Sequence, residues 1–105
     1  MVSKKKRVTK DLFHVIMKTG RVISSPLFLF RYIPQKDVKI AFVAPKSIAK
    51  SAVERNSLRR RGYNTIRNIP LQNIACIFFY KKEAKKASFE EIKKEVENTL
   101  KRVKI

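Results

Sequence analysis

The residues with the clearest capacity for chemistry form the basic segment 46–67. The segment contains seven lysines and arginines and a single acid, Glu54, in the order KSIAKSAVERNSLRRRGYNTIR. An arginine guanidinium binds phosphate through two parallel hydrogen bonds and stacks on bases, whereas a lysine acts as a mobile point charge. The chemistry that this segment predicts is therefore the binding of a polyanion, with RNA as the first candidate.

Helical phasing divides the basic segment into two faces. One arc of about 100° carries small and apolar residues, namely Leu58, Gly62, Thr65 and Ile66. The opposite arc carries Asn56, Arg59, Arg60, Tyr63 and Arg67, with Arg55 at its flank. We expect the first arc to pack on a sheet and the second to face outward. The arginines of the second face have no acid among them, which favours a bound polyanion over a simply solvated surface.

The chain offers no catalytic set of its own. Its only glycines, Gly20 and Gly62, cannot form a glycine-rich phosphate loop. No cysteine and histidine spacing suits zinc, and the carboxylates show no grouping for two-metal phosphoryl transfer. His14, the only histidine, lacks evident partners for acid–base or metal chemistry. We therefore expect neither a catalytic residue nor a metal site in the protein.

Length and composition suit one small domain beside a polyanion. With 105 residues and 44% hydrophobic content, the chain can bury a modest core, so we expect residues 1–105 to form a single domain and 1–7 a mobile basic tail. The net charge of +18 favours nucleic acid over an anionic membrane as the partner. No apolar run is long enough to span a bilayer. The lack of a secretion signal and the single cysteine, Cys76, favour a cytoplasmic location.

A short helix and two strands are expected before the basic helix. The first helix has Thr9 or Asp11 as its cap and stops at Gly20. An extended segment then covers 21–33, with aromatic residues alternating along it, and a second strand covers 38–43. The turn between these two segments favours a hairpin.

The basic helix and two further elements complete the predicted domain. Ser51-x-x-Glu54 is a capping-box pattern, which places the basic helix over 52–67. Residues 74–80, IACIFFY, read as a strand covered on both faces, so a parallel β-α-β crossover is the natural arrangement. A second capping box, at 88–91, begins a final amphipathic helix.

The basic helix resembles the signature of a known family. Residues 52–60, AVERNSLRR, together with Lys46 and Lys50, resemble the RNR signature of the bacterial ribonuclease P protein subunit. The similarity extends through nearly the whole chain, because the opening helix, the strand before the signature, IACIFFY and the final helix follow in the family's order. Ser57 and Tyr63 stand where the family usually has arginine.

The resemblance implies a fold and a division of labour. The fold is α+β, a single-domain α-β sandwich in the order αβββαβα, with a small mixed sheet and a left-handed β-α-β crossover. In that family the RNA subunit is the catalyst and removes the 5′ leader of precursor tRNA with magnesium, which is bound mainly by the RNA. The protein is the non-catalytic subunit, and its implied partners are ribonuclease P RNA and precursor tRNA, with no membrane or protein partner.

The resemblance also assigns roles to individual residues. The residues expected to bind the catalytic RNA are Lys46, Lys50, Arg55, Asn56, Arg59, Arg60 and Arg67. Phe13 and Arg31 are expected in a cleft for the leader, where an aromatic ring can stack on an unpaired base. The alternatives are core packing for Phe13 and an exposed edge-strand charge for Arg31.

Two other functions are weighed beside this one. Charge and size alone also suit a structural ribosomal or other rRNA-binding protein. A nuclease that cuts with its own side chains is the third possibility, and it lacks a catalytic constellation.

Overall fold

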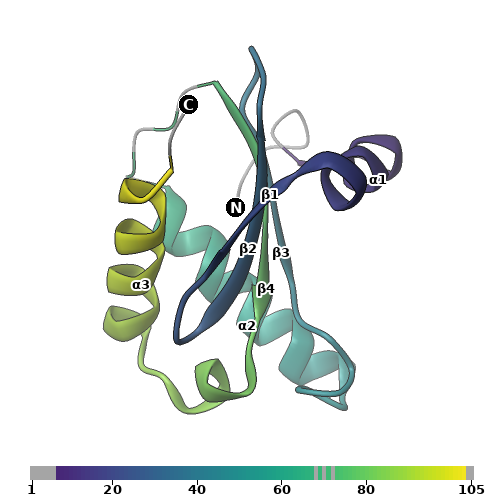
Figure 1. Ribbon diagram of the computed structural model, residues 1–105. Helices are drawn as coiled ribbons and strands as arrows, with labels where there is room; N and C mark the ends of the chain where they lie inside the picture. The colour runs from purple at the N-terminus through teal and green to yellow at the C-terminus, as the bar shows by residue number, and fades with distance from the viewer. Residues whose placement is uncertain (1–6, 68, 70, 72, 104–105) are drawn as a thin grey trace.

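The computed structural model describes residues 7–103 apart from 68, 70 and 72 (Figure 1). In chain order its elements are α1 (Lys10–Thr19), β1 (Arg21–Ser24), β2 (Phe28–Pro34), β3 (Lys39–Val43), α2 (Ala52–Ile66), β4 (Ile74–Tyr80), the 3-10 helix η2 (Lys82–Lys86) and α3 (Phe89–Lys101). The predicted α+β class and the αβββαβα order are confirmed. No helix in the described part of the chain is long and apolar enough to cross a membrane.

The four strands form one mixed sheet in the order β1-β2-β4-β3. β2 is antiparallel to both β1 and β4, whereas β3 and β4 are parallel and are joined through α2, as the predicted crossover requires. The predicted hairpin between 21–33 and 38–43 is wrong, because β4 lies between β2 and β3. The nearly all-apolar β4 needs cover on both faces, so it takes a central place and leaves β3 at an edge.

The extended segment 21–33 is also not one strand. Pro26 lies in a turn that separates β1 from β2, and these two strands make the actual hairpin. Ser25 holds the turn, since its backbone N–H donates to the Phe28 carbonyl at 2.9 Å and its hydroxyl oxygen accepts from the Phe28 N–H at 3.1 Å. A proline cannot donate to a strand ladder, which explains why the break falls there.

Helices cover both faces of the sheet, with α1 on one side and α2 and α3 on the other (Figure 1). The alternation predicted along 21–33 is borne out in β2. Phe28, Phe30 and Tyr32 are buried in the larger core with α2 and α3. Ile33 faces the smaller core beneath α1, which is built around Ile16 and Ile77.

The first helix begins and ends near the predicted residues. Thr9 is the N-cap, and its hydroxyl oxygen accepts from the Leu12 N–H at 3.2 Å. Gly20 ends the helix with an ordinary negative φ of −69°, so a left-handed conformation is not the reason for glycine. A Cβ at Gly20 would lie 2.3 Å from the Ile16 carbonyl oxygen, which means that close approach of the backbone requires it.

The N-terminal segment meets the outer edge of β3 just before α1. Residues 1–6 lie outside the described residues. Arg7 forms a parallel bridge with Ile40 on the outer edge of β3, and the Val8 N–H donates to the Ile40 carbonyl at 3.4 Å. An edge strand offers unpaired backbone groups, and this segment satisfies some of them. The mobility of residues 1–7 stays a prediction.

Candidate nucleic-acid interface

The small and apolar stripe of α2 packs against the sheet as predicted. Its buried residues are Leu58, Gly62, Thr65 and Ile66. The approach is closest at Gly62, where a Cβ would lie 2.4 Å from Phe42 Cδ1 and 2.6 Å from the Tyr80 hydroxyl. The absence of a side chain at this position lets α2 lie directly on β3 and β4. The orientation of the basic face is thereby set by the core.

A buried hydroxyl also anchors α2. Tyr80 at the end of β4 donates a hydrogen bond to the Leu58 carbonyl oxygen. Burial raises the pKa of Tyr80, so its hydroxyl keeps the proton that this bond needs. Tyr80 thus joins the sheet to the middle of α2 by a hydrogen bond as well as by packing.

Tyr63 does not face outward as the helical phasing suggested. Its ring meets the Phe42 ring edge-on at a centroid distance of 5.1 Å, and its hydroxyl oxygen accepts from the Phe42 N–H at 3.3 Å. β3 is an edge strand, so this backbone N–H would otherwise lack a strand partner. The tyrosine therefore completes the edge of the sheet, which accounts structurally for one of the departures from the family signature.

The outward face of α2 carries the predicted polar and basic side chains. Asn56, Arg60 and Arg67 are exposed, and Arg59 is partly exposed. The Arg59 guanidinium donates to the Asn56 amide oxygen, which orients both side chains on the surface. Guanidinium groups held in this way are suited to phosphate oxygens, because less side-chain freedom is lost on binding.

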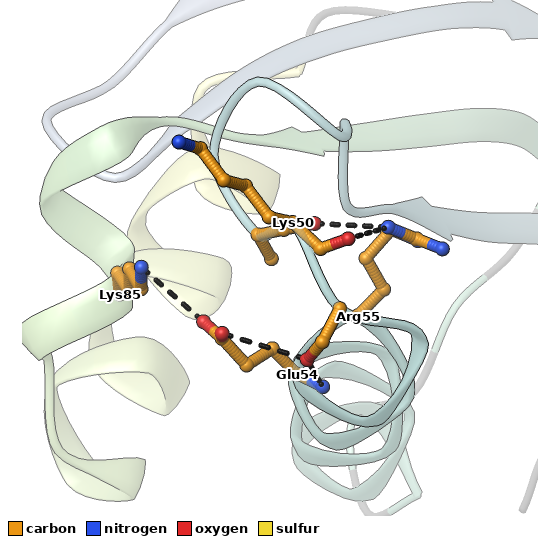
Figure 2. A network of polar contacts seen from close by, with 6 residues as sticks. Lys50, Glu54, Arg55 and Lys85 are labelled. Carbon is orange, nitrogen blue, oxygen red and sulfur yellow. Dashed lines mark hydrogen bonds and ion pairs between the residues drawn. The ribbon is translucent and has the colours of Figure 1, made fainter.

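Arg55 differs from the other arginines of the helix. Figure 2 shows its guanidinium turned back to the loop before α2, where Nη1 donates to the carbonyl oxygens of Ala49 and Lys50 at 3.1 and 2.9 Å. These two hydrogen bonds hold the loop before α2, and the expected contact of Arg55 with RNA stays a prediction. The loop carries Lys46 and Lys50, both exposed, so Arg55 positions two of the other predicted binding residues.

Two loops lie side by side where β3 and β4 end. Since the strands are parallel, the segments that follow them leave the same edge of the sheet. Glu54 at the start of α2 forms an ion pair with Lys85 of η2 at 3.2 Å (Figure 2). Both side chains are substantially exposed, and such a pair contributes about 0–1 kcal/mol. The sequence suggested no contact between these segments.

A groove of about 1090 Å³ opens beside these loops. Met17 of α1, Leu29 of β2 and Phe79 of β4 give it an apolar floor. Five basic side chains also line it, Arg31, Lys50, Lys81, Lys82 and Lys85, together with the carboxylates of Glu54 and Glu83. Apolar side chains beside an excess of cations suit single-stranded nucleic acid, whose bases stack and whose phosphates need cations. The lysines after β4 were not among the predicted site residues.

The two residues predicted for a leader cleft occupy different places. Arg31 lines the groove, where its Nη1 approaches the Met17 carbonyl at 3.5 Å. Its Nε is buried and has no hydrogen-bond partner among the described residues. Phe13 does not line the groove. Its half-buried ring packs edge-on against the ring of Phe79 at a centroid distance of 6.1 Å. This contact agrees with the core-packing alternative, and a part for Phe13 in leader binding stays a prediction.

Acid and thiol groups in the described residues offer little for metal chemistry. No group of three or more histidine, cysteine and carboxylate side chains is placed to hold a metal ion there. Cys76 is buried within β4, and burial raises the pKa of its thiol. The Cys76 thiol is therefore protonated near neutral pH and enclosed in the core.

The family model and the curated relatives that match this chain carry the name ribonuclease P. A family model described as ribonuclease P matches residues 2–104. The ribonuclease P protein component of a Nitratiruptor species is 46% identical over 52 residues, which cover 50% of this chain and 47% of that protein. The protein of the same name from Synechococcus elongatus is 36% identical over 58 residues, covering 50% and 48%. The chain thus spans about half the length of the curated relatives it matches.

Solved structures show the same fold. The RNase P protein from Thermotoga maritima superposes with a TM-score of 0.84 at 18% identity, covering 98% of this chain and 100% of that one. The Staphylococcus aureus RNase P protein, solved at 2.0 Å, gives a TM-score of 0.78 at 21% identity, covering 93% and 94%. At these identities the likeness concerns the fold alone.

Proposed function

The chain belongs to the ribonuclease P protein family, and we propose that it is the protein subunit of an RNA-based endoribonuclease. In this function it binds the catalytic RNA and the 5′ leader of precursor tRNA, and it assists removal of the leader to form the mature 5′ end. The RNA performs the chemistry, with magnesium bound mainly by the RNA. The expected location is the cytoplasm, as the sequence predicts.

The observation that carries this proposal is the seating of α2. Its small-residue stripe is buried on β3 and β4, and the opposite face presents Asn56, Arg59, Arg60 and Arg67. A rigid helix with basic side chains on one face supports docking to a folded RNA, because the cations keep fixed spacings. Lys46 and Lys50 extend this face, and Arg55 supports it through the loop carbonyls.

We place the leader in the groove between α1 and the loops after β3 and β4. Arg31 supports this assignment, because its side chain lines the groove and its guanidinium charge suits a leader phosphate. Phe79 supplies an aromatic surface in the floor. Phe13 acts behind it by packing against Phe79. Phe13 is therefore proposed to support the leader site rather than to stack on the leader itself.

The direct test is reconstituted cleavage. The protein is mixed with bacterial ribonuclease P RNA and a precursor tRNA at low magnesium, and the rate of leader removal is measured. We expect the protein to increase this rate, and the Arg59→Ala/Arg60→Ala variant to need a higher protein concentration for the same effect. A folded protein that produces no stimulation contradicts the proposal. Co-sedimentation with ribosomal subunits after a salt wash, without any effect on tRNA ends, would favour the rRNA-binding alternative.

A further inference from the structure

A hollow of about 310 Å³ lies where the N-terminal segment meets α2. It is lined by Arg7, Asn56, Arg59, Arg60 and Tyr63. Resting on the proposed function, we infer that this hollow binds one phosphate group of the RNA backbone and that Arg7 is a further RNA-binding residue. Its volume is at the lower end of the range for ligand pockets, about 300–1,000 Å³, which suits one backbone group better than an extended strand.

The lining of the hollow consists of hydrogen-bond donors. Three guanidinium groups face an amide and a phenol, and none of the described lining residues is acidic. The Asn56 amide oxygen already accepts from Arg59, so the amide presents its N–H₂ group as the group available to a ligand. A site that offers donors and positive charge selects an acceptor-only anion, and the non-bridging oxygens of a phosphodiester have that character.

The backbone of the protein holds two sides of the hollow in place. Arg7 is bridged to Ile40 on the edge of β3, and the Val8 N–H donates to the Ile40 carbonyl at 3.4 Å. On the other side, the Tyr63 hydroxyl accepts from the Phe42 N–H at 3.3 Å. Both contacts use the edge of β3, so the sheet sets the distance between Arg7 and α2. This preorganisation lowers the entropy lost when a phosphate binds.

The inference is tested by equilibrium binding of the full-length protein to ribonuclease P RNA at fixed salt, with Arg7→Ala, Arg59→Ala and the double variant. We expect Arg7→Ala to lower the affinity for RNA about tenfold, which corresponds to roughly one charge-assisted hydrogen bond. The affinity of the double variant should fall by clearly less than the product of the two single effects, because both residues hold the same phosphate. Arg7→Ala should also reduce the slope of log K against log salt by about 1.

Lys10→Ala is the matched control, since Lys10 is an exposed cation near Arg7 that does not line the hollow. Lys10→Ala should change the affinity for RNA by no more than about twofold. Combined with Arg59→Ala, it should give the product of the two single effects. The inference would be overturned if Arg7→Ala lowers the affinity for RNA no more than Lys10→Ala does. It would also be overturned if the effects of Arg7→Ala and Arg59→Ala are fully independent. If Arg7→Ala does not fold, Arg7→Gln is measured in its place, with the same expectations.

Different measurements test the phosphate site in the hollow and the proposed function. Stimulation of cleavage by the wild-type protein tests the function, whereas the coupling between Arg7 and Arg59 tests the hollow. Stimulation without coupling would reject only the hollow. A melting temperature raised by millimolar inorganic phosphate in the wild type but not in Arg7→Ala, without coupling on RNA, would assign the hollow to a free anion and also overturn the inference.

Discussion

Replacing Gly62 with alanine tests how closely α2 is seated on the sheet. A Cβ at this position would lie 2.4 and 2.7 Å from two carbons of the Phe42 ring and 2.6 Å from the Tyr80 hydroxyl. Neither neighbour can move easily. The Phe42 ring is stacked on Phe78 with an interplanar angle of 7°, and the Tyr80 hydroxyl is bonded to the Leu58 carbonyl. The added methyl group must therefore displace the helix or the core.

The expected change in the free energy of unfolding combines two destabilising contributions and one stabilising contribution. Overpacking a well-packed core costs about 1–3 kcal/mol. Displacing the Tyr80 hydroxyl weakens a buried hydrogen bond, which adds about 1 kcal/mol. Alanine in a helix interior is better than glycine by about 1 kcal/mol, which offsets part of this. We expect Gly62→Ala to lower the free energy of unfolding by about 2 kcal/mol and the melting temperature by roughly 10 °C.

Urea unfolding followed by circular dichroism measures this change. Ser57→Ala is the matched control, because Ser57 is exposed on the same helix and the substitution should be neutral or slightly stabilising. In the Gly62→Ala background, Tyr80→Phe removes the oxygen nearest the new methyl group, so it should cost less than it does in the wild type. If Gly62→Ala is as stable as the wild type, the close seating of α2 is refuted.

Three further predictions concern the loop before α2, the buried ionisable groups and the basic face. Arg55→Lys should lower the free energy of unfolding by about 1 kcal/mol in urea because the carbonyl contacts are lost, whereas Arg59→Lys should be nearly neutral. Burial raises the pKa of Cys76, so stability should fall as pH rises above about 8.5, where only the unfolded thiol ionises, and Cys76→Ala should flatten this dependence in urea titrations. Arg59→Ala/Arg60→Ala should reduce the slope of log K against log salt for RNA by about 1.5–2, and an unchanged slope would show that α2 does not meet phosphate.

Features governed by local geometry were predictable from the sequence. The stripe Leu58, Gly62, Thr65 and Ile66 is buried as expected because the turn per residue is the same in every α-helix. Ser51 caps α2 as predicted, with the Glu54 N–H donating to its hydroxyl at 3.1 Å. Ser88 begins α3 with both bonds of a capping box. These contacts join residues three apart, so chain connectivity already brings them together.

Strand pairing was predicted less well. The alternation along β2 separated its two faces, but it could not reveal that β4 would lie between β2 and β3. A hairpin between neighbouring strands and a sheet with an inserted strand present the same local pattern. The choice depends on how much apolar surface each arrangement buries across the whole domain.

The sequence by itself determined the charge, the three helices and the buried stripe of α2, because these depend on composition and on the fixed period of the helix. Only the tertiary structure decided what individual side chains of the basic segment do. Arg55 turns to the loop carbonyls, Tyr63 completes the edge of β3, and Arg7 reaches the hollow beside α2. These roles depend on which backbone groups remain unpaired once the sheet has formed, and strand order sets that property through contacts distant in the chain.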